Sequence, residues 1–318
     1  MTTVAGAPAY ADAALRRLGD ALKDTGYRFT AVTPATHERV NHRPGNARAR
    51  SLRDVLGWGR PFGPGVLPDG IMALLNEAGV LHRDGDTWRS LVRCSTYGGE
   101  LFFHSAFPTT APDAVFFGPD TYRTCDAVVA HLRTRRGARV RRAVDVGCGS
   151  GAVSVTVARH APAAEVIAVD VNPAALRLTA VNAGLAGCGE RVRPVRSDLL
   201  TGVDGSFDLI VSNPPFMIDP DRRAYRDGGE HGHDLPLAVL DAAVHRLAPG
   251  GSLVLFSGTG IVDGHDPLLA AAADRLAGTD LDWTYREVDP DVYSENLDDA
   301  SYAHAERIAV AVLIAIRR

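Results

Sequence analysis

The chain has 318 residues, of which 46% are hydrophobic and 23% charged, and its formal net charge is −4. These values are ordinary for a globular protein of one large or two modest domains; they give no general attraction to nucleic acid, and no apolar run approaches the ~20 residues of a membrane span. The four cysteines are scattered and the N-terminus does not resemble a secretory signal, so we expect a cytoplasmic protein without disulfides.

The first part of the chain, residues 1–110, is predicted to be a small α+β domain. The predicted elements are helices over 11–22, 52–56 and 71–78, strands over 88–95 and 100–105, and a polar loop over 33–50. Ser51 and Gly57 are suited to cap the second helix, and Tyr97-Gly98-Gly99 is suited to turn between the two strands. Helices followed by a hairpin resemble a winged helix, which would serve as a substrate or lid module.

Residues 111–318 are predicted to form a second, larger domain, in which strands alternate with helices. The predicted strands cover 143–146, 165–169, 192–195, 209–212, 252–257, 283–288 and 308–316, and the predicted helices cover 152–160, 173–183, 236–247 and 268–276. This alternation predicts a doubly wound, Rossmann-like α/β sheet of seven strands with the last strand antiparallel. Segment 106–125 connects the two domains, and Tyr285, Tyr293 and Tyr302 of the acidic C-terminal region match no motif.

A glycine-rich loop follows the first strand of this larger domain. Gly147, Gly149 and Gly151 lie between a strand and a helix, where glycine permits a tight turn and a close approach of the backbone to a ligand. Such a loop alone is a weak signal, because nicotinamide-dependent enzymes carry a similar one. Cys148 has no evident neighbouring base and is interpreted as a small filler rather than a nucleophile.

Three carboxylates decide between the possible cofactors. Asp145 precedes the glycines, Asp170 ends the next strand, and Asp198 follows the third. In a doubly wound sheet such side chains gather at the carboxyl ends of adjacent strands. There they can pair with an ammonium group, accept ribose hydroxyls and meet an adenine amino group, whereas they would repel a pyrophosphate. The pattern therefore favours a cationic, hydroxyl-rich nucleoside.

In this combination of loop and carboxylates, residues 115–260 resemble the class I S-adenosylmethionine-dependent methyltransferases. The resemblance implies that S-adenosyl-L-methionine is the cofactor and S-adenosyl-L-homocysteine the product. The residues that it assigns to the cofactor are Asp145 and Gly147 near the methionine part, Asp170 at the ribose, Asp198 at the adenine amino group, and Val171 and Leu199 at the adenine faces.

The fourth strand of the predicted sheet ends in Asn213-Pro214-Pro215-Phe216, here called the corner. Two prolines fix the backbone, so the Asn213 side-chain oxygen and the Pro214 carbonyl can both accept hydrogen bonds from one planar nitrogen. Phe216 offers a flat face for stacking. The alternative is a proline turn that merely ends a buried strand, but an asparagine before two prolines at this strand favours a catalytic role for these four residues.

The corner resembles the Asn-Pro-Pro-Tyr/Phe motif of amino-methyltransferases that modify adenine, guanine or glutamine side-chain nitrogen. Phe117-Gly-Pro-Asp-Thr121-Tyr122 and Gly228-Gly229-Glu-His-Gly232 resemble segments of the release-factor glutamine methyltransferases. The resemblance implies that Thr121 contacts the cofactor carboxylate and that Tyr122 packs nearby, while the polar stretch over 219–226 is able to form a lid. Phe216 departs from the commoner tyrosine, and the N-terminal domain does not resemble the five-helix domain of bacterial release-factor enzymes.

The sequence leaves the acceptor open. An arginine-rich run from Arg133 to Arg142 and the winged-helix-like domain favour a macromolecule, either protein or nucleic acid, although such a run is equally typical of a solvated helix end. The negative net charge favours a small metabolite, including a variant in which the cofactor cyclises and releases methylthioadenosine. A non-catalytic cofactor-binding protein is disfavoured because the corner is intact. No metal is expected, since His231-Gly-His233 has no partner cluster.

Overall fold

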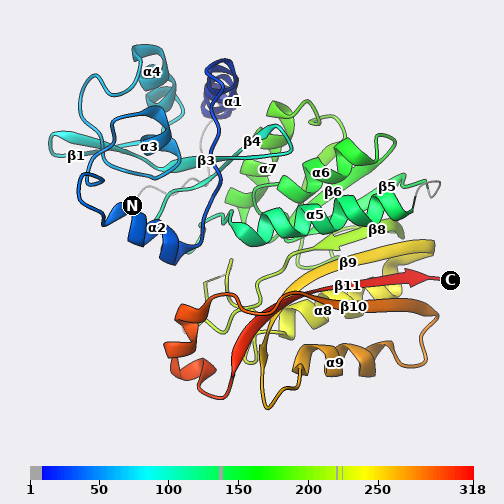
Figure 1. The fold of residues 1–318 in the computed structure, drawn as a ribbon. Helices are drawn as coiled ribbons and strands as arrows, with labels where there is room; N and C mark the ends of the chain where they lie inside the picture. The colour runs from blue at the N-terminus through cyan, green and yellow to red at the C-terminus, as the bar shows by residue number, and fades with distance from the viewer. Residues whose placement is uncertain (1–8, 136–138, 220, 224) are drawn as a thin grey trace.

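A computed structural model describes residues 9–135, 139–219, 221–223 and 225–318. The chain forms a seven-stranded sheet with helices on both faces, and a smaller N-terminal module lies at one end of that sheet (Figure 1). The predicted doubly wound α/β fold is therefore confirmed. Among the helices in these ranges, none combines the length and the apolar character that crossing a membrane requires.

The central sheet has the strand order β10-β11-β9-β8-β5-β6-β7. Its strands are β5 (Arg142–Val146), β6 (Glu165–Asp170), β7 (Val192–Arg196), β8 (Phe207–Ser212), β9 (Leu247–Ile261), β10 (Leu281–Asp289) and β11 (Arg307–Arg317). Strands β7, β6, β5, β8 and β9 run parallel, and β11 runs antiparallel to both of its neighbours, as predicted for the last strand. The strand order reverses between β5 and β8, which is where an open α/β sheet binds its ligand.

Helices cover both faces of this sheet (Figure 1). Helices α5 (Pro119–Thr134), α6 (Ala152–His160) and α7 (Pro173–Leu185) cover one face, and α8 (Asp234–Arg246) and α9 (Pro267–Leu276) cover the other. The side chain of Asn172 caps α7 by accepting a hydrogen bond from the Ala174 N–H group. Helix α5 begins at Pro119, inside the segment 106–125 that was predicted as a connection. The sequence did not reveal this start, because Pro-Asp is typical of a turn as well as of a helix N-terminus.

The N-terminal module combines short helices with two hairpins. Its elements are α1 (Ala9–Asp24), α2 (Pro34–Asn41), α3 (Leu52–Leu56), α4 (Asp69–Glu77), β1 (Leu81–Asp84), β2 (Thr87–Ser90), β3 (Val92–Tyr97) and β4 (Glu100–Ser105). The single strand predicted over 88–95 is wrong. It is divided between β2, which pairs with β1, and β3, which pairs with β4.

The predicted loop over 33–50 is also wrong, because it contains helix α2. The Thr33 side chain caps this helix by accepting a hydrogen bond from the Thr36 N–H group. His37 is buried, with Nε2 2.8 Å from the Trp58 carbonyl oxygen. Contacts with the rest of the module therefore stabilise a helix that its polar sequence does not reveal.

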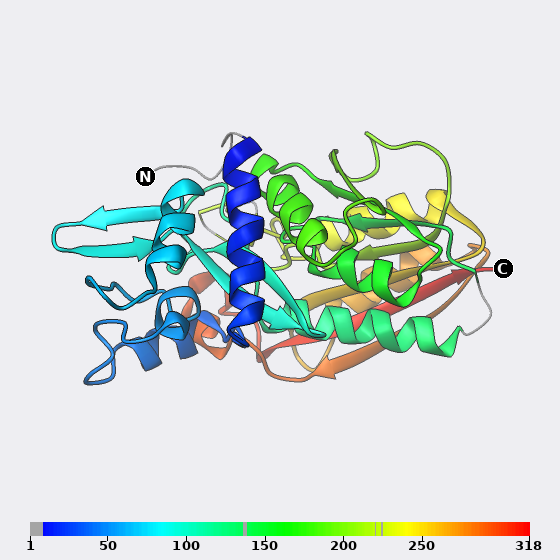
Figure 2. The ribbon, with the colours of Figure 1, turned by 90° about the horizontal axis from the view of Figure 1, so that it is seen from above.

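The N-terminal module and α7 share one hydrophobic core, and Figures 1 and 2 show α1 beside α7. A Cβ on Gly19 would lie 2.4 Å from Leu185 Cδ2, so the two helices approach closely. Arg177 donates to Asp12 at 2.5 Å. The Asn182 side-chain amide accepts a hydrogen bond from the Phe103 N–H group and donates one to the Phe103 carbonyl oxygen. These contacts hold the module firmly against the sheet domain. The division into domains 1–110 and 111–318 stays a prediction.

The arginine-rich run lies far from the ligand-binding edge of the sheet. It starts near the end of α5, a 16-residue helix that is about 24 Å long, and continues to the start of β5. Arg135 donates to the Gly250 carbonyl at 2.7 Å, and the Arg142 guanidinium lies 4.6 Å from the ring centre of Phe207. Arg136 lies outside the described residues. The arginines with these contacts serve the packing of the sheet domain.

Candidate functional site

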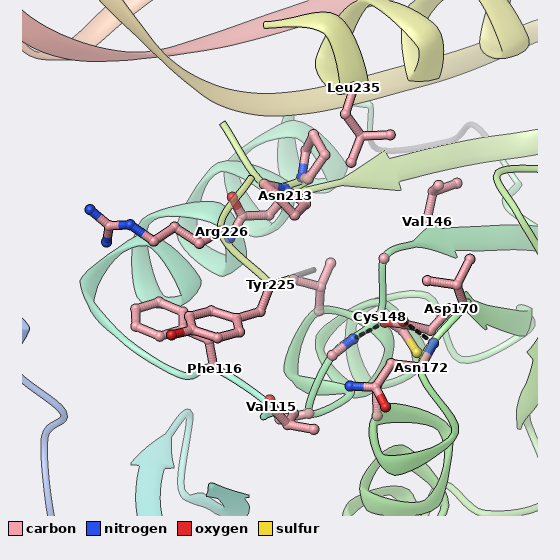
Figure 3. A pocket seen from close by; sticks show the side chains of 18 of the residues that line it. Val115, Phe116, Val146, Cys148, Asp170, Asn172, Asn213, Tyr225, Arg226 and Leu235 are labelled. Carbon is pink, nitrogen blue, oxygen red and sulfur yellow. Dashed lines mark hydrogen bonds between the residues drawn. The ribbon is translucent and has the colours of Figure 1, made fainter. Parts of the chain in front are cut away.

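A cavity of about 250 Å³ opens at the carboxyl ends of β5, β6 and β8, at the reversal of strand order (Figure 3). The loops that follow these strands form most of its wall. The first turn of α5 and the segment before it form another part. Pro34 of the N-terminal module, Leu235 and Val239 of α8, and Tyr293 of the C-terminal segment also line the cavity. The site therefore combines distant parts of the chain.

The glycine loop presents open backbone to this cavity. Gly147 and Gly149 have positive φ values of 74° and 52°, which favour glycine. A Cβ on either residue would meet no atom within 4 Å, so a ligand can approach the backbone there. This open surface fits the nucleoside cofactor that the loop and its carboxylates imply.

Asp170 fixes the shape of the loop. Its Oδ2 accepts a hydrogen bond from the Gly149 N–H group at 3.0 Å, and its Oδ1 accepts one from the Asn172 N–H group at 2.9 Å, as the dashed lines of Figure 3 show. Burial raises the pKa of Asp170, whereas these backbone hydrogen bonds lower it. Asp170 thus joins the end of β6 to the loop after β5 while lining the cavity.

Asp145 lies beneath the same loop and is 1% exposed. Its Oδ2 accepts a hydrogen bond from Ser154 Oγ at 2.6 Å. Burial raises the pKa of Asp145 to about 7, with Asp170 adding to the rise and Ser154 opposing it. Burial likewise raises the pKa of the Cys148 thiol far above its ordinary value. A thiol in that state is a poor nucleophile, which agrees with the interpretation of Cys148 as a filler.

The predicted adenine residues Val171, Asp198 and Leu199 all line the cavity. Val171 is 50% exposed, although it is apolar, and Leu199 has a positive φ of 48°, which is uncommon for a residue other than glycine. An exposed valine beside a strained leucine offers an apolar surface that a flat ring can cover.

The corner lies opposite the glycine loop. All four of its residues line the cavity, and within the described chain the Asn213 amide makes no hydrogen bond. The Phe216 ring centre lies 6.3 Å from those of Phe256 and Tyr293. The amide is therefore available to a ligand, while the aromatic ring is held in place.

The Gly228-Gly229-Glu-His-Gly232 segment packs directly under the corner. The Gly228 N–H group donates to the Met217 carbonyl oxygen at 2.8 Å. A Cβ on Gly228 would lie 2.7 Å from Phe216 Cα. The absence of a side chain lets these two backbone segments touch, so this motif supports the corner.

Two of the predicted cofactor residues do not line the cavity. Tyr122 points into the N-terminal module, where its hydroxyl accepts a hydrogen bond from the Ala31 N–H group at 2.8 Å and its ring packs edge-on against Phe117. Gly151 has a φ of 77°, and a Cβ there would lie 2.9 Å from Thr179 Cγ2, so it serves the packing of α6 against α7. Thr121 does line the cavity.

Sequence reasoning gave no role to Phe116 and Asp120, which line the cavity, and it placed Tyr225 only in a stretch able to form a lid. Phe116 and Tyr225 stack with an interplanar angle of 10° (Figure 3), and Tyr225 also donates to the Thr109 carbonyl oxygen. This pair joins the segment before α5 to the polar stretch over 219–226, of which Pro220 and Ala224 lie outside the described residues. Asp120 stands inside the recognised Phe117–Tyr122 motif but received no role.

Comparisons with known proteins identify a methyltransferase domain in the part of the chain that forms most of the cavity. The family model of the methyltransferase small domain matches residues 111–261. A release factor glutamine methyltransferase of Bradyrhizobium diazoefficiens is 33% identical over 178 residues, covering 51% of this chain and 60% of the relative. A 4-amino-L-phenylalanine/4-methylamino-L-phenylalanine methyltransferase of Streptomyces pristinaespiralis is 31% identical, covering 51% and 59%. The chain thus spans less than two thirds of either relative's length.

A solved structure supports the fold. Trm5b of Pyrococcus abyssi superposes with a TM-score of 0.50 at 15% identity, covering 75% of this chain and 62% of that one. Within the ranges that the model describes, no three histidine, cysteine, aspartate or glutamate side chains gather as a metal site. Residues 111–261 therefore carry a methyltransferase small domain, and the chain has the fold of the class I S-adenosylmethionine-dependent methyltransferases.

Proposed function

We propose that this protein transfers a methyl group from S-adenosylmethionine to a planar nitrogen, either an amide or an aromatic or exocyclic amine. One observation carries the proposal: the glycine loop with its carboxylates and the Asn213-Pro214-Pro215-Phe216 corner line the same cavity. The relatives named above modify a glutamine and an amino-phenylalanine, and both of these present a nitrogen attached to a flat group.

The residues of the chain would bind and orient the reactants. When bound, the cofactor supplies an electrophilic methyl group. Asp170 would accept hydrogen bonds from the ribose hydroxyls, and Asp198 would accept one from the adenine amino group. Asp145 would face the ammonium group of the cofactor. Asn213 Oδ1 and the Pro214 carbonyl oxygen would accept hydrogen bonds from the N–H groups of the methyl-accepting nitrogen. These bonds would fix the direction of the nitrogen lone pair and stabilise the positive charge that develops on the nitrogen.

Calorimetry of the purified protein with S-adenosylmethionine and S-adenosylhomocysteine tests cofactor binding. Incubation with S-adenosylmethionine and cell extracts, followed by mass spectrometry, then finds products that have gained one CH₂. Incubation with the cofactor alone separates methyl transfer from the cyclisation alternative, because cyclisation releases methylthioadenosine. A protein that binds neither nucleoside would refute the proposal.

A small-metabolite acceptor is the second candidate. The relative that acts on 4-amino-L-phenylalanine favours it. So does the location of the arginine-rich run, at the end of the sheet remote from the cavity. The same screen applied separately to protein, nucleic-acid and metabolite fractions distinguishes the candidates. The four cysteines are buried and unpaired, and the cytoplasmic location inferred from the sequence stays a prediction.

A further inference from the structure

Asp120 is a buried carboxylate in the wall of the cavity. It belongs to the first turn of α5 and is 3% exposed. Its Oδ2 accepts a hydrogen bond from the Tyr293 hydroxyl, whereas its Oδ1 is buried without any hydrogen-bond partner. The nearest cation is Arg123, whose Nη1 lies 3.9 Å from Oδ1, and Arg123 itself pairs with Asp289 at 2.6 Å. A buried oxygen of this kind is costly unless a ligand donates to it.

Tyr293 holds this carboxylate in place from a distant part of the chain. It stands 173 positions after Asp120, and its backbone has a left-handed φ of 54°, a conformation that costs about 1 kcal/mol or more outside glycine. Burial raises the pKa of Tyr293 well above its ordinary value, so the hydroxyl stays protonated and donates. The strained backbone at Tyr293 thus places the tyrosine hydroxyl where it donates a hydrogen bond to one oxygen of Asp120.

The same tyrosine joins Asp120 to the reacting end of the cavity. The ring centres of Tyr293 and Phe216 are 6.3 Å apart, and Phe216 belongs to the corner that would hold the acceptor nitrogen. The adenine residues Val171 and Leu199 follow other strands of the sheet. Asp120 is therefore associated with the acceptor end of the cavity through its partner.

We propose that Asp120 Oδ1 faces the acceptor nitrogen, accepts an N–H hydrogen bond from it, and receives the proton that leaves after methyl transfer. This inference rests on the proposed function and adds a proton acceptor to the hydrogen-bond acceptors of the corner.

The nitrogen lone pair forms the new N–C bond while the C–S bond breaks, and sulfur keeps that electron pair and becomes neutral. The nitrogen becomes positively charged and passes one proton to the Asp120 carboxylate, which later releases it to water. Burial raises the pKa of Asp120 to about 6, with Tyr293 and Arg123 lowering it and Asp289 raising it. A base with this pKa is ionised at neutral pH and still able to hold a proton.

A pair of ligands tests the position of Asp120 without a known acceptor. Sinefungin and S-adenosylhomocysteine share the adenosine and amino-acid parts, but sinefungin carries an amine where the transferable methyl group stands. The wild-type protein should prefer sinefungin at about pH 8, because its ammonium group would contact Asp120. Asp120→Asn should reduce this preference roughly tenfold or more, as expected for a charged hydrogen bond, and leave the affinity for S-adenosylhomocysteine unchanged.

Asp126→Asn is the matched control. Asp126 lies on the same helix and also accepts a hydrogen bond from a tyrosine, Tyr97, at 2.8 Å, but it does not line the cavity. This variant should keep the wild-type preference. Retained binding of S-adenosylhomocysteine shows that each variant is folded.

Three results would overturn the inference and leave the proposed function standing. The first is a wild-type protein without preference for sinefungin, and the second is an Asp120→Asn variant that keeps the preference. The third is a variant that loses affinity for sinefungin and S-adenosylhomocysteine equally, which would place Asp120 at the amino-acid end of the cofactor. Failure of the wild-type protein to bind either compound would instead remove the proposed function and this inference with it.

The pH dependence of the same preference provides a second readout. The preference should disappear as the pH falls through about 6, the pKa of Asp120, because the protonated carboxyl group carries no charge. Tyr293→Phe removes the hydroxyl that stabilises the carboxylate, so the transition should move to higher pH. If the wild-type protein and Tyr293→Phe lost the preference at the same pH, the hydrogen bond from Tyr293 would not control the pKa of Asp120.

Discussion

The ring of Phe216 occupies the space in which a side chain at Gly258 would have to stand, since a Cβ on Gly258 would lie 2.4 Å from Phe216 Cδ2. Gly258 belongs to β9 and pairs with Val310 of β11. Phe256 and Tyr293 contact the same ring. The position of the last residue of the corner is therefore set by a glycine in the neighbouring strand.

Gly258→Ala should displace Phe216, because the ring is packed against its neighbours and cannot move away at low cost. We expect a loss of about 1–3 kcal/mol in the free energy of unfolding, as is typical of overpacking. Methyl transfer to the acceptor found by the extract screen should fall more than the affinity for S-adenosylhomocysteine. Gly70→Ala is the control, because a Cβ there meets no atom within 4 Å. Unchanged stability and activity of Gly258→Ala would contradict this description of the corner.

Asn213→Ala should separate binding from chemistry. The Asn213 amide makes no hydrogen bond within the described chain, so its loss should leave the fold and the affinity for S-adenosylmethionine nearly unchanged. Methyl transfer should decrease by about 10²–10³-fold, since one acceptor for the reacting nitrogen is removed. Calorimetry and mass-spectrometric turnover measure the two effects, with the exposed Asn76→Ala as control. A parallel loss of binding and turnover would show that Asn213 is a structural residue.

The sheet and the loops that line the proposed cofactor end of the cavity were predictable from the sequence because their signals are local. Parallel strands buried on both faces read as near-continuous apolar runs, and β5, β6 and β8 have Gly147, Asp170 and Asn213 at or just after their carboxyl ends. Asn172 with Pro173, for example, marks both the end of a loop and the start of α7. Short-range signals of this kind depend little on the rest of the fold.

The proposed acceptor end was not predictable, because it is formed by contacts between residues that lie far apart in the sequence. Tyr293 attracted notice but matched no motif, and its partner Asp120 stands 173 positions away. The prediction for Tyr122 followed a family motif, but the structure turns its hydroxyl toward Ala31 of the N-terminal module. Because the motif alone says nothing about the N-terminal module, the contact of Tyr122 with Ala31 could not be anticipated from it.

Asp170→Ala should weaken cofactor binding more than Asp198→Ala does. Asp170 orders the loop by accepting hydrogen bonds from Gly149 and Asn172, so its removal costs both a ligand contact and the shape of the loop. We expect roughly tenfold or greater loss of affinity for S-adenosylhomocysteine by calorimetry. Asp198 is exposed, and its replacement should cost only a few-fold. If Asp170→Ala bound with wild-type affinity, the ribose assignment would be wrong.

The stability of the ligand-free protein should depend on pH through the carboxyl group of Asp145. The pKa of Asp145 is raised from 3.8 to about 7, mainly by burial. A carboxyl group with a raised pKa in the folded state contributes stability that is fully present below about pH 4 and is lost as the pH rises through about 7. Asn at this position stays neutral and can still accept the hydrogen bond from Ser154.

The free energy of unfolding of Asp145→Asn should therefore match that of the wild-type protein near pH 4 and exceed it by a few kcal/mol near pH 8. Denaturant unfolding at the two pH values measures this difference, and Asp24→Asn, at an exposed position, is the control. The variant should also bind S-adenosylmethionine more weakly, because it cannot pair with the ammonium group. A stability difference of the same size at both pH values would show that Asp145 is not held as a buried acid, and the pairing proposed for it would lose its physical basis.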